Sequence, residues 1–254
     1  MDYNKVVEKI GSFLNQKLEE AGAEGFVTGI SGGLDSAVVA TLATEAVGPE
    51  NVHGWVMPGE PSDQENMADA RELADNLGIT LRDVNIEDTV QSFNKKAPFE
   101  TDKLTEGNVR ARVRMVYEYM DANQNNLMVL GGGNKTEAKI GYFTKYGDSA
   151  VDLVPIGDLY KTEVRELARH IGLDKKFIEK KPTAGLWEGQ TDEGELGASY
   201  ETIDKILKRL IEKEQSAAEI AENTEIPWDK VEKFRDMNRR TEHKRRTPPY
   251  PDLR

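Results

Sequence analysis

A glycine-rich turn between an apolar run and a helix start constrains the fold of this chain more than any other feature. Residues 25–30, GFVTGI, read as a short buried strand, and residues 29–36, GISGGLDS, lead from it into a helix. Adjacent glycines at a helix start let several backbone N–H groups surround one point, where the helix dipole favours an anion. Ser31 and Ser36 add hydroxyl donors, and Asp35 could cap the helix or hold a Mg²⁺ ion that bridges phosphates. The turn predicts a phosphate site, although a plain strand–turn–helix with a serine cap would share its outline.

Strand-like and helix-like segments alternate through the first two-thirds of the chain. Helices are expected at residues 4–20, 35–47, 62–77, 105–124 and 161–171, and strands at residues 25–30, 52–58, 79–84 and 126–132. A further apolar run, VDLVPI, occupies residues 151–156. The alternation predicts an α/β fold with a doubly wound, Rossmann-like parallel sheet covered by helices on both faces. Ligands of such folds bind beyond the carboxyl ends of the strands, so a second glycine turn at residues 131–133 should lie beside the first.

The strand-like pattern stops after about residue 174. Residues 182–198 have no periodicity and predict a long loop of the kind that often acts as a functional lid. Helices are expected at residues 199–213, 216–223 and 228–238, before a basic, proline-rich end, RRTEHKRRTPPYPDLR. We expect a single domain over residues 1–254, with an α/β nucleotide-binding core at 1–173 and a part made of the loop, helices and tail at 174–254.

Charge and composition exclude several classes of protein. The net charge of −12 argues against nucleic acid as the main partner, because phosphate-backbone binding requires a basic surface. The chain has no cysteine, which excludes disulfides, cysteine-ligated zinc, iron–sulfur clusters and a thiol nucleophile. No apolar run approaches the roughly 18 residues of a membrane span, and the N-terminus, MDYNKVVEKI, lacks a signal-peptide pattern. We therefore expect a cytoplasmic protein with neither a membrane nor a nucleic-acid partner.

The chemistry-bearing motifs together resemble one enzyme family. SGGLDS is neither a Walker loop nor a GxGxxG fingerprint, and it resembles the loop of the N-type ATP pyrophosphatases, which split ATP between its α and β phosphates. The further motifs are GNVRARVRM (107–115), GGGNKTE (131–137), GYFTKYGDSAVDLVPIGDLYKTEVR (141–165), KPTAGLWEGQTDEGELG (181–197) and HK (243–244). On these motifs the chain is identified as similar to the ammonia-dependent NAD synthetases over nearly its whole length. The resemblance implies a homodimer, with the helices at 4–20 and 105–124 as candidate contacts, although burial in the monomer core would explain their apolar faces equally well.

This resemblance implies that the chain uses ATP and Mg²⁺ to amidate deamido-NAD with ammonia, giving NAD, AMP and pyrophosphate through an adenylated carboxylate. It implies ATP contacts for Gly29, Ile30, Ser31, Gly32, Gly33, Leu34, Asp35, Ser36, Gly132, Lys161 and Thr183. Deamido-NAD contacts are implied for Arg112, Lys145, Asp152, His243 and Lys244. Asp35 and Glu137 would hold Mg²⁺, and Asp35 and Lys161 would act in catalysis. One position departs from the family, because Gly132 stands where a threonine is usual and only a backbone contact to ATP remains.

Several alternatives remain at this point. Taken alone, the arginines at 110, 112 and 114 would read as a solvated helix face, Lys161 as a surface lysine and the basic tail as a nucleic-acid arm. A different ATP pyrophosphatase, acting on XMP or tRNA, would share SGGLDS, and a nucleotide sensor without chemistry would keep the loop but lose the downstream lysines and carboxylates. The absence of cysteine leaves free ammonia as the expected nitrogen source, unless a separate subunit delivers it.

Overall fold

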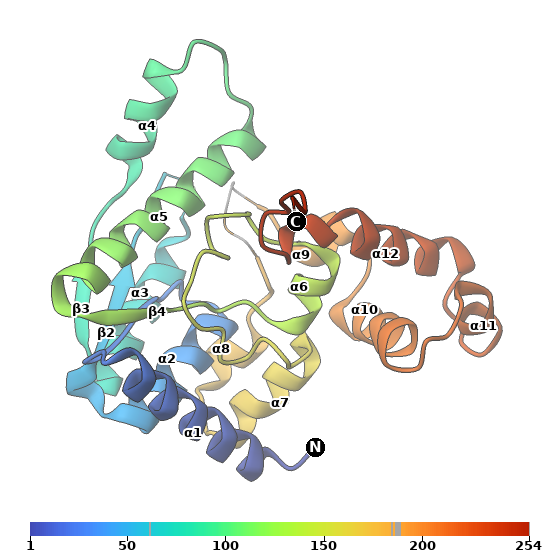
Figure 1. Cartoon of the computed structure of the whole chain (residues 1–254), viewed down its shortest axis with the longest axis horizontal. Coiled ribbons are helices and arrows are strands. Elements are labelled where there is room, and N and C mark those ends of the chain that lie inside the picture. The colour runs from blue at the N-terminus through green and yellow to red at the C-terminus, as the bar shows by residue number, and fades with distance from the viewer. Residues whose placement is uncertain (61, 184, 186–188, 254) are drawn as a thin grey trace.

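Four parallel strands form the centre of the structure, a computed structural model that describes residues 1–60, 62–183, 185 and 189–253 (Figure 1). The strands are β1 (Gly25–Gly29), β2 (Val52–Val56), β3 (Thr80–Asp83) and β4 (Leu127–Leu130), in the order β3-β2-β1-β4. The chain moves outward from β1 to β3 and then returns to the other side of β1. This reversal confirms the doubly wound sheet and makes the gap beyond β1 and β4 its topological switch point.

Helices cover both faces of this sheet, as the alternation predicted. Helix α5 packs on β1 and β4, whereas α2 packs on β1 and β2. Neighbouring residues of a strand point to opposite faces, so Phe26 joins the core under α2 while Val27 packs with Ala122 of α5. The helices and short turns of this part are α1 (Tyr3–Ala21), α2 (Leu34–Val47), η1 (Pro49–Asn51), α3 (Gln64–Leu77), α4 (Glu87–Lys96), α5 (Lys103–Asn125), α6 (Lys135–Ile140), α7 (Lys161–His170) and α8 (Lys175–Glu179).

The later helices build a second core beside the sheet (Figure 1). They are α9 (Asp192–Leu196), α10 (Tyr200–Leu207), η2 (Lys208–Glu212), α11 (Ala217–Glu222), α12 (Trp228–Arg240) and η3 (Glu242–Lys244). Tyr200, Ile203 and Phe234 are fully buried there, and Ile140 of α6 packs among them. Helix α6 therefore touches the helical part while its own N-terminus faces the sheet edge. The division expected near residue 174 stays a prediction, and α8 packs with the first core through Phe177.

Several segments differ from the expectation, among them the short helices α6 and α8, which were not predicted. The apolar run at 151–156 joins the sheet only by an isolated bridge between Leu130 and Leu153. Helix α4 was not expected, because it buries only Val90 and so gives a weak apolar pattern. The long segment at 182–198 contains α9 near its end; residues 184 and 186–188 of that predicted loop lie outside the described residues. Among the described helices, none has the length and apolarity that crossing a membrane requires.

Candidate active site

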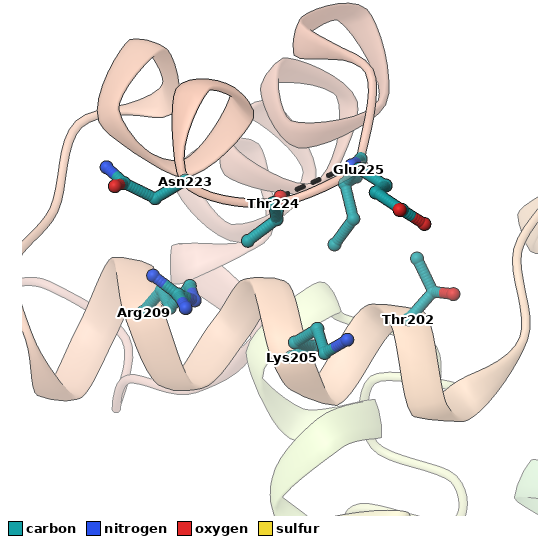
Figure 2. Close-up of a pocket in the computed structure, with 7 residues that line it drawn as sticks. Thr202, Lys205, Arg209, Asn223, Thr224 and Glu225 are labelled. Carbon is teal, nitrogen blue, oxygen red and sulfur yellow. Dashed lines mark hydrogen bonds between the residues drawn. The ribbon is translucent and has the colours of Figure 1, made fainter.

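A cleft of about 580 Å³ opens at the carboxyl ends of β1 and β4. Both glycine turns line it, as the side-by-side prediction required, together with the Thr183 region and side chains from α5 and α6. A second hollow of about 490 Å³ lies far along the chain, between α10–η2 and the turn after α11 (Figure 2). Its lining residues are Thr202, Lys205, Arg209, Asn223, Thr224, Glu225 and Ile226, none of which belongs to a predicted site. The cleft is therefore the candidate site.

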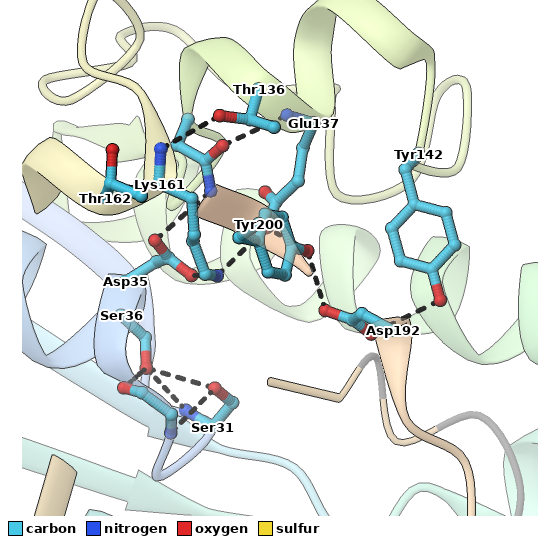
Figure 3. Close-up of polar contacts among 12 residues, drawn as sticks. Ser31, Asp35, Ser36, Thr136, Glu137, Tyr142, Lys161, Thr162, Asp192 and Tyr200 are labelled. Carbon is cyan, nitrogen blue, oxygen red and sulfur yellow. Dashed lines mark hydrogen bonds and ion pairs between the residues drawn. The ribbon is translucent and has the colours of Figure 1, made fainter. Parts of the chain in front are cut away.

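The loop after β1 has the geometry of an anion cradle. Gly33 is the N-cap of α2, and among the described residues no side chain caps this helix, so its first N–H groups point into the cleft. The loop hydroxyls bond within the loop: Ser31 Oγ and Ser36 Oγ are 3.0 Å apart, and Ser36 Oγ donates to the Gly33 carbonyl over 3.1 Å (Figure 3). Gly32 has a φ of +75°, and a Cβ there would lie 2.0 Å from the Asn66 carbonyl oxygen. Only glycine therefore fits this turn.

Asp35, Glu137 and Lys161 meet at the edge of the cleft (Figure 3). Asp35 lies in the first turn of α2, Glu137 lies in the first turn of α6, and Lys161 begins α7. The Lys161 ammonium bonds to Asp35 and lies 3.1 Å from Glu137 Oε1. Three helix N-termini that are distant in sequence thus converge, which confirms the predicted proximity of the two carboxylates.

Burial and charge oppose each other in this group. Burial raises the pKa of Glu137 to about 7, although the Lys161 ammonium acts to lower it. Burial alone would lower the pKa of Lys161, but the carboxylates of Asp35 and Glu137 outweigh it and raise that pKa. The lysine therefore stays charged and offsets part of the negative charge of the two acids. Lys161 is only 3 % exposed, which is inconsistent with a solvated surface lysine.

The same group fits a magnesium ion that shares its ligands with a phosphate. Two carboxylates already hold one cation between them, and they are the hard oxygen donors that Mg²⁺ prefers. The described residues contain no group of three acidic or histidine side chains that could hold a metal alone. Mg²⁺ is commonly bound by one or two carboxylates plus substrate phosphates, and the neighbouring loop supplies the place for those phosphates.

Helix α10, which lies within the helix expected at residues 199–213, supports this group. Asp204 of α10 is 2 % exposed and accepts bonds from the Thr136 hydroxyl and the Thr162 N–H, the latter over 2.9 Å. Thr136 adjoins Glu137, and Thr162 adjoins Lys161, so α10 fixes both functional residues from behind. Asp204 and Tyr200 were missed because an isolated acid or tyrosine in an amphipathic helix carries no motif.

The residues predicted to contact deamido-NAD divide into three places. Lys244 lines the cleft and donates to the carbonyls of Gly141 and Phe143, each over 2.7 Å. Three others form a chain outside the cleft, in which Arg112 donates to the Lys145 carbonyl over 3.1 Å and Lys145 Nζ lies 3.5 Å from His243 Nδ1. Asp152 lies apart from them.

Asp152 is exposed and bonds to the sheet rather than to the cleft. It accepts a bond from the Tyr119 hydroxyl over 3.1 Å and from the Val129 N–H over 2.7 Å.

Two predicted ATP contacts, Gly132 and Thr183, do line the cleft. A Cβ at Gly132 would lie no closer than 3.7 Å to any other atom, so lack of space at the Cβ does not explain why this position is glycine.

The first part of the basic tail, up to Arg245, folds back onto α6, whereas residues 246–253 are exposed. Arg245 donates to the carbonyls of Ala138 and Lys139 at the end of that helix, over 3.0 and 3.1 Å. Gly141, at the same end, has a φ of +69° and leaves no room for a Cβ beside Thr241. The tail therefore brings Lys244 to the cleft, and it contradicts the alternative of a free nucleic-acid arm.

Comparisons with known proteins agree on one family. The family model described as NAD synthase matches residues 6–248. An NH(3)-dependent NAD(+) synthetase from Thermococcus kodakarensis is 48% identical over 253 residues, covering 100% of this chain and 99% of that protein. One from Methanocaldococcus jannaschii is 45% identical, covering 98% of this chain and 97% of that protein.

Two solved structures share the fold along their whole length. An NMN synthetase from Francisella tularensis has a TM-score of 0.89 and 33% identity, with 100% of both chains covered. An NH3-dependent NAD synthetase from Campylobacter jejuni, in complex with the nitrate ion, has a TM-score of 0.85 and 30% identity, covering 99% of this chain and 100% of that one.

Proposed function

Because the chain belongs to the NAD synthase family, we propose that it is a ligase that amidates deamido-NAD with ammonia at the expense of ATP, releasing NAD, AMP and pyrophosphate. The observation that carries this proposal is the convergence of the anion cradle with Asp35, Glu137 and Lys161 at the switch point of the sheet. Since the substrates are cellular nucleotides, the reaction belongs in the cytoplasm.

The first step activates a poor acyl donor. The nicotinate carboxylate attacks the α-phosphorus of ATP, an acyl–adenylate bond forms, and pyrophosphate leaves. The N–H groups at the start of α2 and the hydroxyls of Ser31 and Ser36 hold the phosphates, and Lys161 neutralises the negative charge that gathers on them. Asp35 and Glu137 would hold Mg²⁺, which supplies further neutralisation of the phosphates when bound. Ammonia then attacks the activated carbonyl, and AMP leaves.

The substrate's own charges match the residues outside the cleft. Arg112, Lys145 and His243 form a basic line that suits the pyrophosphate of deamido-NAD, and Lys244 continues it into the cleft. Asp152, held by Tyr119 and the end of β4, suits a ribose hydroxyl. Arg112, Asp152 and His243 are exposed in the single chain, which leaves room for a second chain to complete this site.

We therefore also propose a homodimer. Apolar side chains stand exposed along α4, α5 and the segment between them; they are Phe93, Phe99, Leu104, Val116 and Met120. The α5 part of the predicted contact gains support from this row, whereas α1 offers only Phe13, at 37 % exposure. Helix α5 also carries Arg112, so pairing along it would cover the basic line.

The nitrogen donor follows from composition and from the relatives. The chain has no cysteine for a glutaminase nucleophile, and its curated relatives are named for NH(3). Free ammonia is the proposed donor. A nicotinate mononucleotide acceptor is the second candidate, because the fold also matches an NMN synthetase at a TM-score of 0.89.

The test is to incubate the chain with ATP, Mg²⁺, ammonium and either deamido-NAD or nicotinate mononucleotide. The proposal expects NAD, AMP and pyrophosphate in equal amounts, with the dinucleotide the better acceptor by kcat/KM. Formation of ADP would refute the reaction type, and a preference for the mononucleotide would replace the proposed substrate by the second candidate. Sedimentation of the same sample checks the dimer.

A further inference from the structure

A buried tyrosine hydroxyl lies between two carboxylates that belong to different parts of the molecule. Tyr200, the first residue of α10, is 0 % exposed. Its hydroxyl donates to Asp192 Oδ2 over 2.9 Å and stands 3.5 Å from Glu137 Oε1 (Figure 3). Asp192 begins α9, whereas Glu137 is one of the two proposed metal ligands on α6.

We infer that Tyr200 is a positioning residue that sets the Glu137 carboxylate for Mg²⁺ and links it to α9 through Asp192. This inference rests on the proposed function, because it concerns the metal half of that site. Groups that bond to metal ligands orient them, and their loss commonly weakens metal binding.

The chemistry of a phenol supports the link. Its hydroxyl carries a single proton, which can serve only one of the two carboxylates at a time. When the proton is donated to Asp192, the Tyr200 oxygen presents its lone pairs to Glu137. The repulsion between the two oxygens then favours a Glu137 carboxylate that is turned toward a cation. The contact of Tyr200 with Asp192 and the orientation of the Glu137 carboxylate are therefore coupled. A change in either one affects the other.

Contacts of α10 and of the Tyr200 ring hold Tyr200 in place. One turn further along α10, Asp204 bonds to the residues that adjoin Glu137 and Lys161. The Lys161 ammonium also lies 5.1 Å from the centre of the Tyr200 ring. The ring is thus held against α6 and α7, the helices that carry Glu137 and Lys161. A small displacement of its hydroxyl would change its contact with Glu137.

A second tyrosine provides a matched control. The Tyr142 hydroxyl also donates to Asp192, to Oδ1 over 3.2 Å, and it bonds to Glu195 of α9 as well. Its partners in the described structure are these two acids, and Glu137 is not among them. Tyr142→Phe therefore loosens α9 without touching the metal ligand, whereas Tyr200→Phe removes both contacts and keeps the ring.

The experiment measures Mn²⁺ binding by electron paramagnetic resonance, with an ATP analogue that carries a methylene group between the α and β phosphates. No turnover is needed, so failure of the proposed acceptor chemistry would not affect the result. We expect Tyr200→Phe to weaken Mn²⁺ binding by about tenfold, and Tyr142→Phe to stay within about twofold of the native protein. In turnover assays Tyr200→Phe should raise the Mg²⁺ concentration needed for half-maximal rate.

Two results would overturn the inference. One is native Mn²⁺ affinity in Tyr200→Phe, and the other is an equal loss in both variants, which would assign the effect to α9 alone. If Tyr200→Phe does not fold by circular dichroism, Asp192→Ala tests the same link from its other end. It should change Mn²⁺ affinity more than about threefold, and an unchanged affinity would count against the inference.

Discussion

The two halves of the proposed active site are built in different ways. The phosphate half is one continuous stretch, residues 29–36, whose two hydroxyls bond to each other and to the Gly33 carbonyl within the loop. The metal half draws Glu137 and Lys161 from separate helices and is fixed by a third, α10. The first half is encoded in neighbouring residues, whereas the second exists only when the helical part packs against the sheet. Their dependence on the rest of the fold should differ accordingly.

Removing a carboxylate should have the largest effect. Glu137→Ala is expected to reduce kcat/KM by at least about 100-fold, because the cation loses half of its protein ligands. Asp35→Ala, on the phosphate half, should cost as much, since one ion would serve both halves. Steady-state kinetics at saturating Mg²⁺ provides the measurement, and native activity in either variant would disprove the metal assignment.

Gly32→Ala should break the phosphate half locally. The added Cβ meets a backbone oxygen at 2.0 Å in a left-handed conformation, so we expect a loss of about 3 kcal/mol in the free energy of unfolding. Gly11→Ala is the matched control, because nothing lies within 4 Å of a Cβ there and the helix should gain slightly. Urea denaturation compares them; equal stability of the two variants would contradict the reading of this turn.

Asp204→Ala should break the metal half from a distance. The change leaves the Thr162 N–H and the Thr136 hydroxyl unpaired in a buried place, which costs about 2 kcal/mol. Asp158→Ala is the control, since that carboxylate is 98% exposed in its pair with Lys135 and should change stability by less than about 0.5 kcal/mol. The ATP affinity of Asp204→Ala should fall less than its Mg²⁺ affinity. The reverse order would contradict the division of the site into a phosphate half and a metal half.

The same difference decides how much could be predicted from the sequence. The parallel sheet, the two adjacent glycine turns and the pairing of Asp35 with Glu137 followed from apolar period, glycine position and a family resemblance. The supporting contacts of Tyr200, Asp204 and Arg245 did not, because they depend on how helices pack, and no local pattern marks a residue that bonds across the fold. Helix α4, which buries only one side chain, was also not predicted.

Gly132→Thr should have a modest effect in the favourable direction. The nearest atom to a Cβ at this position is 3.7 Å away, so a Cβ fits there without displacement. A hydroxyl beside the N-terminus of α2 would gain about 1 kcal/mol if it bonds to ATP, which corresponds to a KM for ATP about fivefold lower. Kinetics with varied ATP checks this, and a raised KM would show that the extra space is needed by the ligand.

The last prediction concerns a distant contact of the phosphate half with α5. Glu118 of α5 sits against the end of β1, with its carboxyl group beside Gly29. Burial raises the pKa of Glu118 to about 8, against the opposing effect of Arg114, while the ordinary value is near 4.5. Between these two pH values the folded protein keeps a proton that the unfolded chain releases, so this residue makes the fold less stable as pH rises through that window.

Glu118→Gln keeps the size of the side chain and removes the titration. Its Tm, relative to the native protein, should therefore rise between pH 5 and pH 8.5. Thermal unfolding at several pH values makes the comparison, with the exposed Asp158→Ala variant as the control whose difference from native stays flat. A constant difference for Glu118→Gln would mean that Glu118 is ionised throughout, and that the phosphate half needs no support from α5 beyond ordinary packing.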